Sequence, residues 1–164
     1  MKKGMAFAMA AALLLGTACG GTEGAGSSQN AKDVDLPALY AAAEAEYGWE
    51  EGYMASLDGG LLENYYPGLA DIPAKQLIAQ VPAMSSDVNE LVFMECEDAE
   101  GAKDAAAILQ SRIDEQANGG ALYPETMEAW KKAEVVQQGN YVALVASGAH
   151  QAELVEDFNA AFED

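Results

Sequence analysis

The chain has little positive charge. Eight lysine and arginine residues stand against 27 aspartate and glutamate residues, which gives a formal net charge of -19 at pH 7. Such a surface repels the phosphates of nucleic acids and the anionic headgroups of lipids. We therefore expect no nucleic-acid partner, and we interpret the acidity as a source of solubility rather than as a cation site.

Histidine and cysteine are also scarce. The chain has one histidine, His150, and two cysteines. These are too few for the usual nitrogen and sulfur zinc site, and we expect His150 to be a solvated helix residue. Neither a phosphate-binding glycine loop nor a Gly-x-Ser-x-Gly nucleophile motif is present. The sequence therefore predicts no catalytic residues, no bound metal and no cofactor, and a protein that is not an enzyme.

A long apolar run is missing too. The apolar stretch 5–15 is much shorter than the roughly 20 residues that a membrane-spanning helix needs. It follows Lys2 and Lys3 and leads through small residues to Cys19, an order typical of a bacterial export signal that ends at a lipid-attachment cysteine. We predict a signal peptide over residues 1–18, with diacylglycerol and palmitate attached at Cys19.

The small residues at 16–18 also fit ordinary secretory cleavage, which would leave a secreted protein with a free N-terminal cysteine. The Cys-Gly-Gly start favours the lipoprotein. We therefore expect attachment to the cell membrane through the lipid on Cys19, with the protein facing outside the cytoplasm. Residues 19–34 predict a flexible tether of about 20 Å average length, and residues 35–164 predict a single domain.

Apolar periodicity predicts hairpins that alternate with helices. Asp35 and Asp98 are expected N-caps, and turn-forming residues separate two pairs of extended runs. The expected elements are helix 36–47, an irregular connection 49–74, strands 77–84 and 91–96, helix 99–117, a short helix from 124, strands 134–137 and 141–147, and helix 149–162. This order predicts an α+β fold: an antiparallel sheet built from two hairpins, with helices packed on one face, preceded by an N-terminal helix.

Arg112 is the only arginine, and acidic residues surround it on its helix. We expect Arg112 to form a structural ion pair with Asp114, Glu115 or a hairpin carboxylate such as Glu90, rather than to bind a ligand. Cys96 ends an apolar strand beside acidic neighbours, which disfavour a thiolate. We expect it to be a small core residue without a disulfide partner, because the other cysteine is the predicted lipid site.

Two groups of residues are candidates for binding. Trp49, Tyr65 and Tyr66 form a candidate binding surface for sugar or peptide, although packing of the irregular connection explains them equally well. The acidic residues between 95 and 100 offer oxygen ligands, but they lack the spacing of a calcium loop, so we predict no metal there. Any two carboxylates could lie at the separation that glycoside hydrolysis needs, which keeps an envelope hydrolase open as an alternative.

Several short runs resemble a known family. The run 82–90 (Pro-Ala-Met-Ser-Ser-Asp-Val-Asn-Glu), Arg112, Tyr123 before a proline, and the run 139–142 (Gly-Asn-Tyr-Val) are similar to those of the small bacterial lipoproteins catalogued as a domain of unknown function, DUF4358. The likeness extends over about residues 35–162. It implies a lipid-anchored envelope protein and supplies no catalytic residue.

Together these observations predict a lipid-anchored envelope lipoprotein that acts as a non-enzymatic accessory domain. Its expected partner is an envelope protein or a small extracellular ligand. The carboxylate-based envelope hydrolase and a purely structural acidic spacer are the alternatives.

Overall fold

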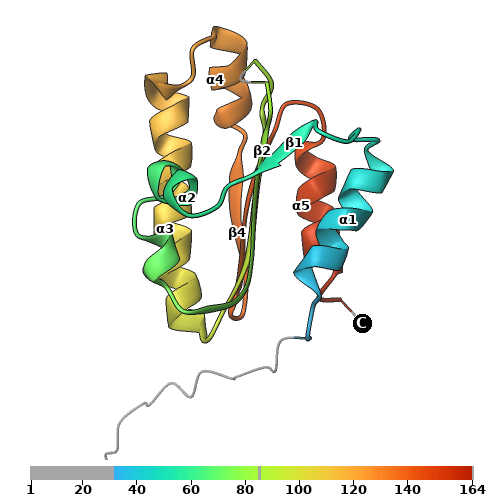
Figure 1. The fold of residues 1–164 in the computed structure, drawn as a ribbon, viewed down its shortest axis with the longest axis vertical. Helices are drawn as coiled ribbons and strands as arrows, with labels where there is room; N and C mark the ends of the chain where they lie inside the picture. Colours follow the sequence, from blue (N-terminus) through green and yellow to red (C-terminus); the bar gives the residue numbers. More distant parts are fainter. Residues whose placement is uncertain (1–31, 85, 164) are drawn as a thin grey trace, which may run out of the picture.

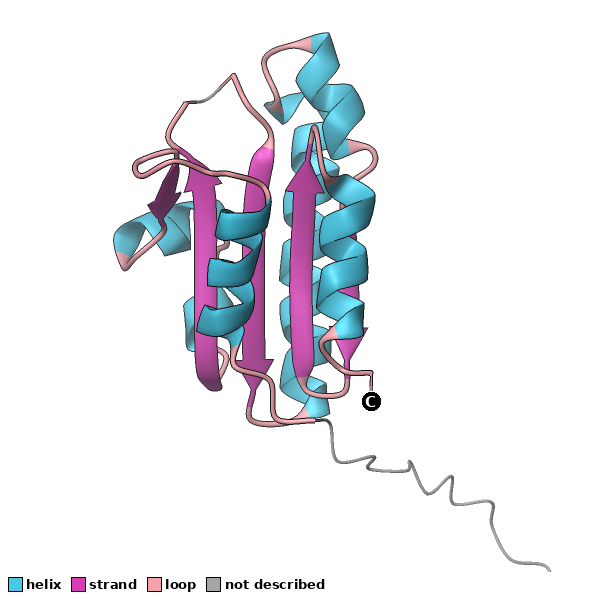
Figure 2. Ribbon diagram, turned by 90° about the vertical axis from the view of Figure 1, so that its right-hand side faces the viewer, coloured by secondary structure: helices cyan, strands magenta, loops and turns pink. Residues whose placement is uncertain are grey.

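The computed structural model describes residues 32–84 and 86–163 (Figure 1, Figure 2). Its strands form a five-stranded antiparallel sheet in the order β1-β2-β3-β5-β4. The strands are β1 (Met54–Ser56), β2 (Ala74–Pro82), β3 (Asn89–Cys96), β4 (Glu134–Gln138) and β5 (Tyr141–Ser147). The helices are α1 (Leu36–Glu46), α2 (Gly60–Tyr65), α3 (Ala99–Glu115), α4 (Pro124–Trp130) and α5 (Gln151–Ala160), with short turns η1 (Leu69–Asp71) and η2 (Gln116–Gly120). The predicted α+β fold, with its antiparallel sheet and N-terminal helix, is confirmed.

The two central strands are buried along their whole length. Every residue of β3 and β5 is buried, and the strands pair antiparallel with Phe93 opposite Ala143. A strand that is covered on both faces needs apolar side chains at both odd and even positions. This requirement explains the nearly continuous apolar runs of β3 and β5.

The helices cover both faces of the sheet, which corrects the prediction that they pack on one face. Helices α2, α3 and α4 lie on one side, here called the first face, and α1 and α5 lie on the other, the second face (Figure 1). Val92 and Met94 join the core of the first face, whereas Leu91 and Phe93 join that of the second. Because side chains alternate along a strand, the unbroken apolar run of β3 needs a helical layer on each side.

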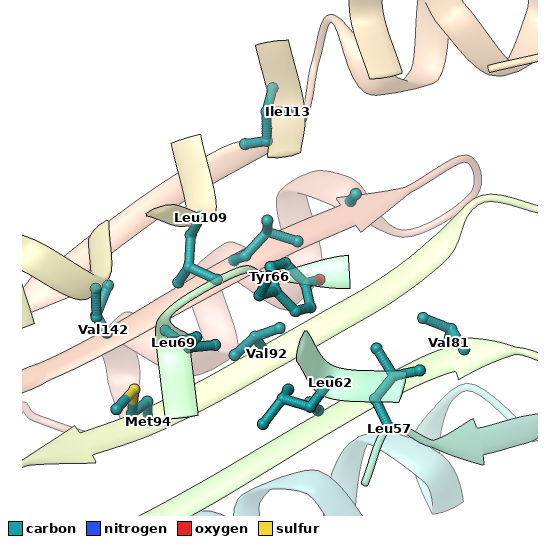
Figure 3. Packing of buried hydrophobic residues seen from close by; sticks show 14 of the residues in the cluster. Leu57, Leu62, Tyr66, Leu69, Val81, Val92, Met94, Leu109, Ile113 and Val142 are labelled. Carbon is teal, nitrogen blue, oxygen red and sulfur yellow. The ribbon is translucent and has the colours of Figure 1, made fainter. Parts of the chain in front are cut away.

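The irregular connection builds part of the first face. Its α2 and η1 turns place Tyr66 and Leu69 between β3 and α3, near Leu109 (Figure 3). The same connection contains β1, which pairs with the end of β2 and adds a fifth strand to the two predicted hairpins. Three residues are too few to show an alternating pattern, which is why sequence periodicity did not reveal this strand.

The predicted helix caps are confirmed. The Asp35 carboxylate accepts a hydrogen bond from the Ala38 N–H (3.0 Å), and the Asp98 carboxylate accepts one from the Gly101 N–H (2.8 Å). Such caps each contribute about 1 kcal/mol to helix stability. The cap at Asp98 marks the start of α3, and Arg112 lies about four turns later, in the last turn of the helix.

The start of the described chain is held at the end of the sheet where β3 finishes. The Val34 N–H donates to the Tyr141 hydroxyl (3.2 Å), and the Gln76 amide donates to the Val34 carbonyl (2.9 Å). Val34 is buried, so this residue packs against the domain. The predicted signal peptide and Cys19 lie outside the described residues. Within the described ranges, no helix has the length and apolar character to cross a membrane.

Candidate functional site

A charged pair lies on the first face at the beginning of β3. The Arg112 Nε donates to Glu90 Oε1 (2.9 Å), and the Arg112 Nη2 donates to Glu90 Oε2 (3.0 Å). The Arg112 side chain is 15% exposed and that of Glu90 is 5% exposed. The predicted ion pair is therefore confirmed, with the hairpin carboxylate as the partner. A two-pronged contact of this kind fixes the guanidinium in one orientation.

Tyr66 completes the environment of the carboxylate. Its hydroxyl donates to Glu90 Oε1 at 2.5 Å, and the residue is fully buried. Burial raises the pKa of Tyr66 well above its usual value, and the charge of Glu90 raises it further. The phenol therefore stays protonated and serves as a permanent donor. As a result, the two oxygens of Glu90 accept three hydrogen bonds from within the protein.

Two aromatic rings flank the arginine. The Arg112 guanidinium carbon lies 4.6 Å from the ring centre of Tyr65 and 5.5 Å from that of Trp130. A cation held near an aromatic face gains about 0.5–2 kcal/mol per contact. Burial opposes the charge of Arg112, but the hydrogen bonds and charge of Glu90 outweigh it and keep the pKa of Arg112 above its usual value. The guanidinium is thus both permanently charged and rigidly placed.

A pocket of about 320 Å³ opens beside this pair, and we call it the Arg112 pocket. The end of β2, the β2–β3 turn, η2 and α4 form its walls. Its apolar lining includes Val81, Pro82, Ala121 and Leu122, and Arg112 is among its polar lining groups. The lining is more polar than apolar, because Asp87, Gln116 and Thr126 also belong to it. The volume lies in the range of sites that bind small molecules or peptide side chains.

Asn89 carries a buried acceptor at the start of β3. The residue is 3% exposed, and its amide nitrogen donates to the Met54 sulfur at 3.4 Å. Its side-chain oxygen accepts no hydrogen bond from the described residues. An unpaired buried acceptor costs about 1–3 kcal/mol.

The geometry suits binding better than proton transfer. A general base must be free to take a proton from a substrate, whereas Glu90 is already bonded to Arg112 and Tyr66. A guanidinium has five N–H donors, of which the pair with Glu90 uses two. Arg112 can therefore still donate to a carbonyl or another acceptor group that enters the pocket.

The three aromatic residues proposed as one binding surface do not form one surface: the ring centres of Tyr65 and Tyr66 lie 6.4 Å apart, whereas Trp49 lies on the opposite face of the sheet. Tyr65 borders the Arg112 pocket, and Tyr66 is fully buried beneath it, so Tyr66 cannot contribute an exposed surface. Trp49 lies on the second face, where it contacts Tyr47 and Tyr53 with ring centres 5.8 and 6.3 Å away. Of the proposed set, only Tyr65 belongs to the pocket.

The other candidate residues have structural surroundings. Cys96 is buried, and burial together with the charges of Asp98 and Glu95 raises its thiol pKa to about 11. His150 stacks on Tyr47 with ring centres 4.5 Å apart. Glu95 accepts hydrogen bonds from the side chains of residues 75 and 76 at 2.8 and 2.7 Å. No cluster of three or more histidine, cysteine, aspartate or glutamate residues suited to a metal ion occurs in the described ranges.

Sequence reasoning did not assign Trp130 and Leu122 to a site. Their contacts to the pocket depend on how α4 and η2 fold back over the sheet, which no local pattern encodes. One signal was available: the run 82–90 and Arg112, which carry much of the family resemblance, meet in this pocket. Tyr123, a third element of that resemblance, directly follows the lining residue Leu122.

Comparison with known proteins identifies a family but no individual relative. No curated protein and no solved structure matches the chain. The model of the family described as "Domain of unknown function (DUF4358)" matches residues 48–147, a shorter range than the resemblance suggested, which excludes α1 and α5 and includes all five strands and the Arg112 pocket. Because this match covers more than half of the sequence, the chain belongs to the DUF4358 family.

Proposed function

We propose that the protein is a lipid-anchored, non-enzymatic binding domain of the bacterial envelope and that the Arg112 pocket is its binding site. The observation that carries the proposal is a concave pocket that combines an apolar patch with polar groups and lies over an arginine whose charge is balanced by Glu90. The charged groups below the pocket are mutually satisfied, so they can hold a ligand without acting as acid or base. The same observation favours binding over carboxylate-based hydrolysis.

The position of the pocket relative to Val34 supports this proposal. Val34 is attached to Tyr141, which pairs with Glu95 at one end of β3, and the pocket lies near Glu90 at the other end. Five residues of strand separate these points by about 17 Å. With a lipid on Cys19, the tether would join the domain at the end opposite the pocket, which would leave the pocket open to partners or ligands in the aqueous space outside the cytoplasm.

The anchoring part of the proposal is tested by metabolic labelling with a clickable palmitate analogue. We expect label and membrane association in the wild-type chain, and loss of both in Cys19→Ser. An unlabelled wild-type chain in the culture medium would contradict the anchor and support the secreted alternative.

The binding part is tested by photo-cross-linking in cells. A benzoylphenylalanine residue at position 122, in the pocket, is compared with one at the exposed position 41 on α1 of the second face. We expect a discrete adduct from position 122 that disappears when Ala83→Phe fills the pocket, and no such adduct from position 41. Equal cross-linking from both positions, or an adduct that is insensitive to Ala83→Phe, would refute the assignment of the site.

A further inference from the structure

The Arg112 pocket continues into a second hollow. This hollow has a volume of about 680 Å³ and lies between the β2–β3 turn, α4 and the start of α5. Asp87, Val88 and Thr126 line both the pocket and the hollow, so the two share a border. We call the second hollow the acidic groove. Together they form an elongated depression at the end of the sheet that lies away from Val34.

Large apolar side chains are exposed along the pocket side of this depression. Leu122 is 81% exposed, Met84 is 66% exposed and Tyr123 is 54% exposed. Leu122 lines the pocket, Tyr123 follows it, and Met84 follows the lining residue Ala83. Among the described residues, the remaining large apolar side chain with comparable exposure is Leu61. Exposed apolar side chains gathered beside a hollow mark an interaction site rather than a solvated surface.

The acidic groove has a strongly negative lining. Four exposed carboxylates line the groove, those of Asp87, Glu125, Glu128 and Glu153. The lining contains one ammonium group, that of Lys132. Glu128 also pairs with Lys131 outside the lining, at 2.6 Å and with both side chains more than half exposed. Exposed pairs of this kind are weak and exchange readily with other cations. The groove therefore favours a positively charged occupant and repels an anionic one.

The pocket itself favours a peptide group. Arg112 retains donors for a carbonyl oxygen, and the apolar lining formed by Val81, Pro82 and Leu122 suits an uncharged side chain. A stacked sugar fits less well, because one face each of Tyr65 and Trp130 is taken up by the guanidinium. A ligand carboxylate without a neighbouring positive charge also fits less well, because Glu90 and Asp87 in the lining would repel it.

We propose that the joined pocket and groove bind an extended, positively charged segment of a partner polypeptide. An apolar side chain of the segment enters the Arg112 pocket, a backbone carbonyl accepts from Arg112, and lysine or arginine residues lie along the acidic groove. This inference rests on the proposed binding function of the pocket and adds the chemical class of the ligand. Charge complementarity between the groove and the segment is the observation that selects this occupant.

The test begins with phage display of short random peptides on the full-length chain in detergent. The affinity of an enriched peptide is then measured by fluorescence anisotropy for three variants. The first neutralises the groove (Glu125→Gln, Glu128→Gln and Glu153→Gln together). The second is a control with the same change in charge at exposed sites outside both hollows (Glu46→Gln, Glu115→Gln and Glu156→Gln together). The third is Ala83→Phe, which fills the pocket.

We expect enriched peptides that combine an apolar residue with flanking lysine or arginine. Groove neutralisation and Ala83→Phe should each weaken binding about tenfold or more, and the control by less than about threefold. Equal weakening by the two triple variants would mean unspecific attraction to an acidic protein and would overturn the inference. Loss of binding in Ala83→Phe alone would overturn the charge assignment but leave the proposed pocket standing. Failure to enrich peptides, or enrichment of acidic ones, would also overturn the inference.

Discussion

Replacing Arg112 with methionine tests whether the charged pair beneath the pocket is organised as described. Methionine keeps an apolar stem between Tyr65 and Trp130 but leaves the Glu90 carboxylate, whose side chain is 5% exposed, with Tyr66 as its remaining donor. Removing one partner of a buried ion pair costs about 3–5 kcal/mol. A natural domain has only about 5–15 kcal/mol of total stability, so this loss is readily measured.

The same reasoning predicts a rescue. Adding Glu90→Gln to Arg112→Met removes the stranded charge, while the amide oxygen can still accept from Tyr66. We expect the double variant to recover about 2 kcal/mol or more, because replacing both partners costs far less than removing one.

Urea unfolding of the full-length chain, followed by circular dichroism, measures both effects. Lys131→Met is a matched control, because it breaks an ion pair whose side chains are 54% and 66% exposed, and we expect no measurable loss of stability. A loss below about 1 kcal/mol for Arg112→Met, or a double variant as unstable as the single one, would refute the view of a buried, mutually dependent pair.

Two further predictions concern titratable groups. Burial opposes the charge of Glu95, but hydrogen bonds from Lys75 and Gln76 outweigh it and hold the pKa of Glu95 below its usual value. The contribution of Glu95 to stability is therefore present above the usual pKa of a glutamate and is lost as the pH falls through the lowered pKa. Glu95→Gln should therefore make the acid side of the stability profile shallower, and an unchanged profile would contradict this. Because burial raises the Cys96 pKa to about 11, iodoacetamide should modify this thiol in Cys19→Ser only after unfolding in urea. Rapid labelling of the folded chain would contradict the buried position.

Local sequence signals predicted most of the secondary structure. Asp35 and Asp98 marked helix starts because a short acidic side chain accepts the free N–H groups of a first turn. Gly139, with φ of +62°, lies in the turn that was expected between the last two strands. Such features depend on neighbouring residues alone, so the sequence is sufficient to reveal them.

Long-range arrangement was harder to predict. Leu91, Val92, Phe93 and Met94 are apolar at both odd and even positions, a signal that the sheet is covered on both faces, yet helices were expected on one. That Arg112 pairs with Asp114, Glu115 or a hairpin carboxylate such as Glu90 was predictable, because the need of a lone arginine for an acidic partner is readable from sequence. The position of Arg112 between two aromatic rings was not, since the rings come from separate helices that meet only through the folded sheet.

The most direct test of the binding site uses the two tryptophans of the chain. Trp49 lies on the second face and Trp130 lines the Arg112 pocket, so in Trp49→Phe the fluorescence reports on the pocket alone. We predict that a display-selected peptide changes the Trp130 emission in a saturable manner, with the affinity found by anisotropy, and that Ala83→Phe abolishes the change. Peptide binding that leaves the Trp130 emission unaltered would place the site elsewhere and contradict the assignment of the Arg112 pocket.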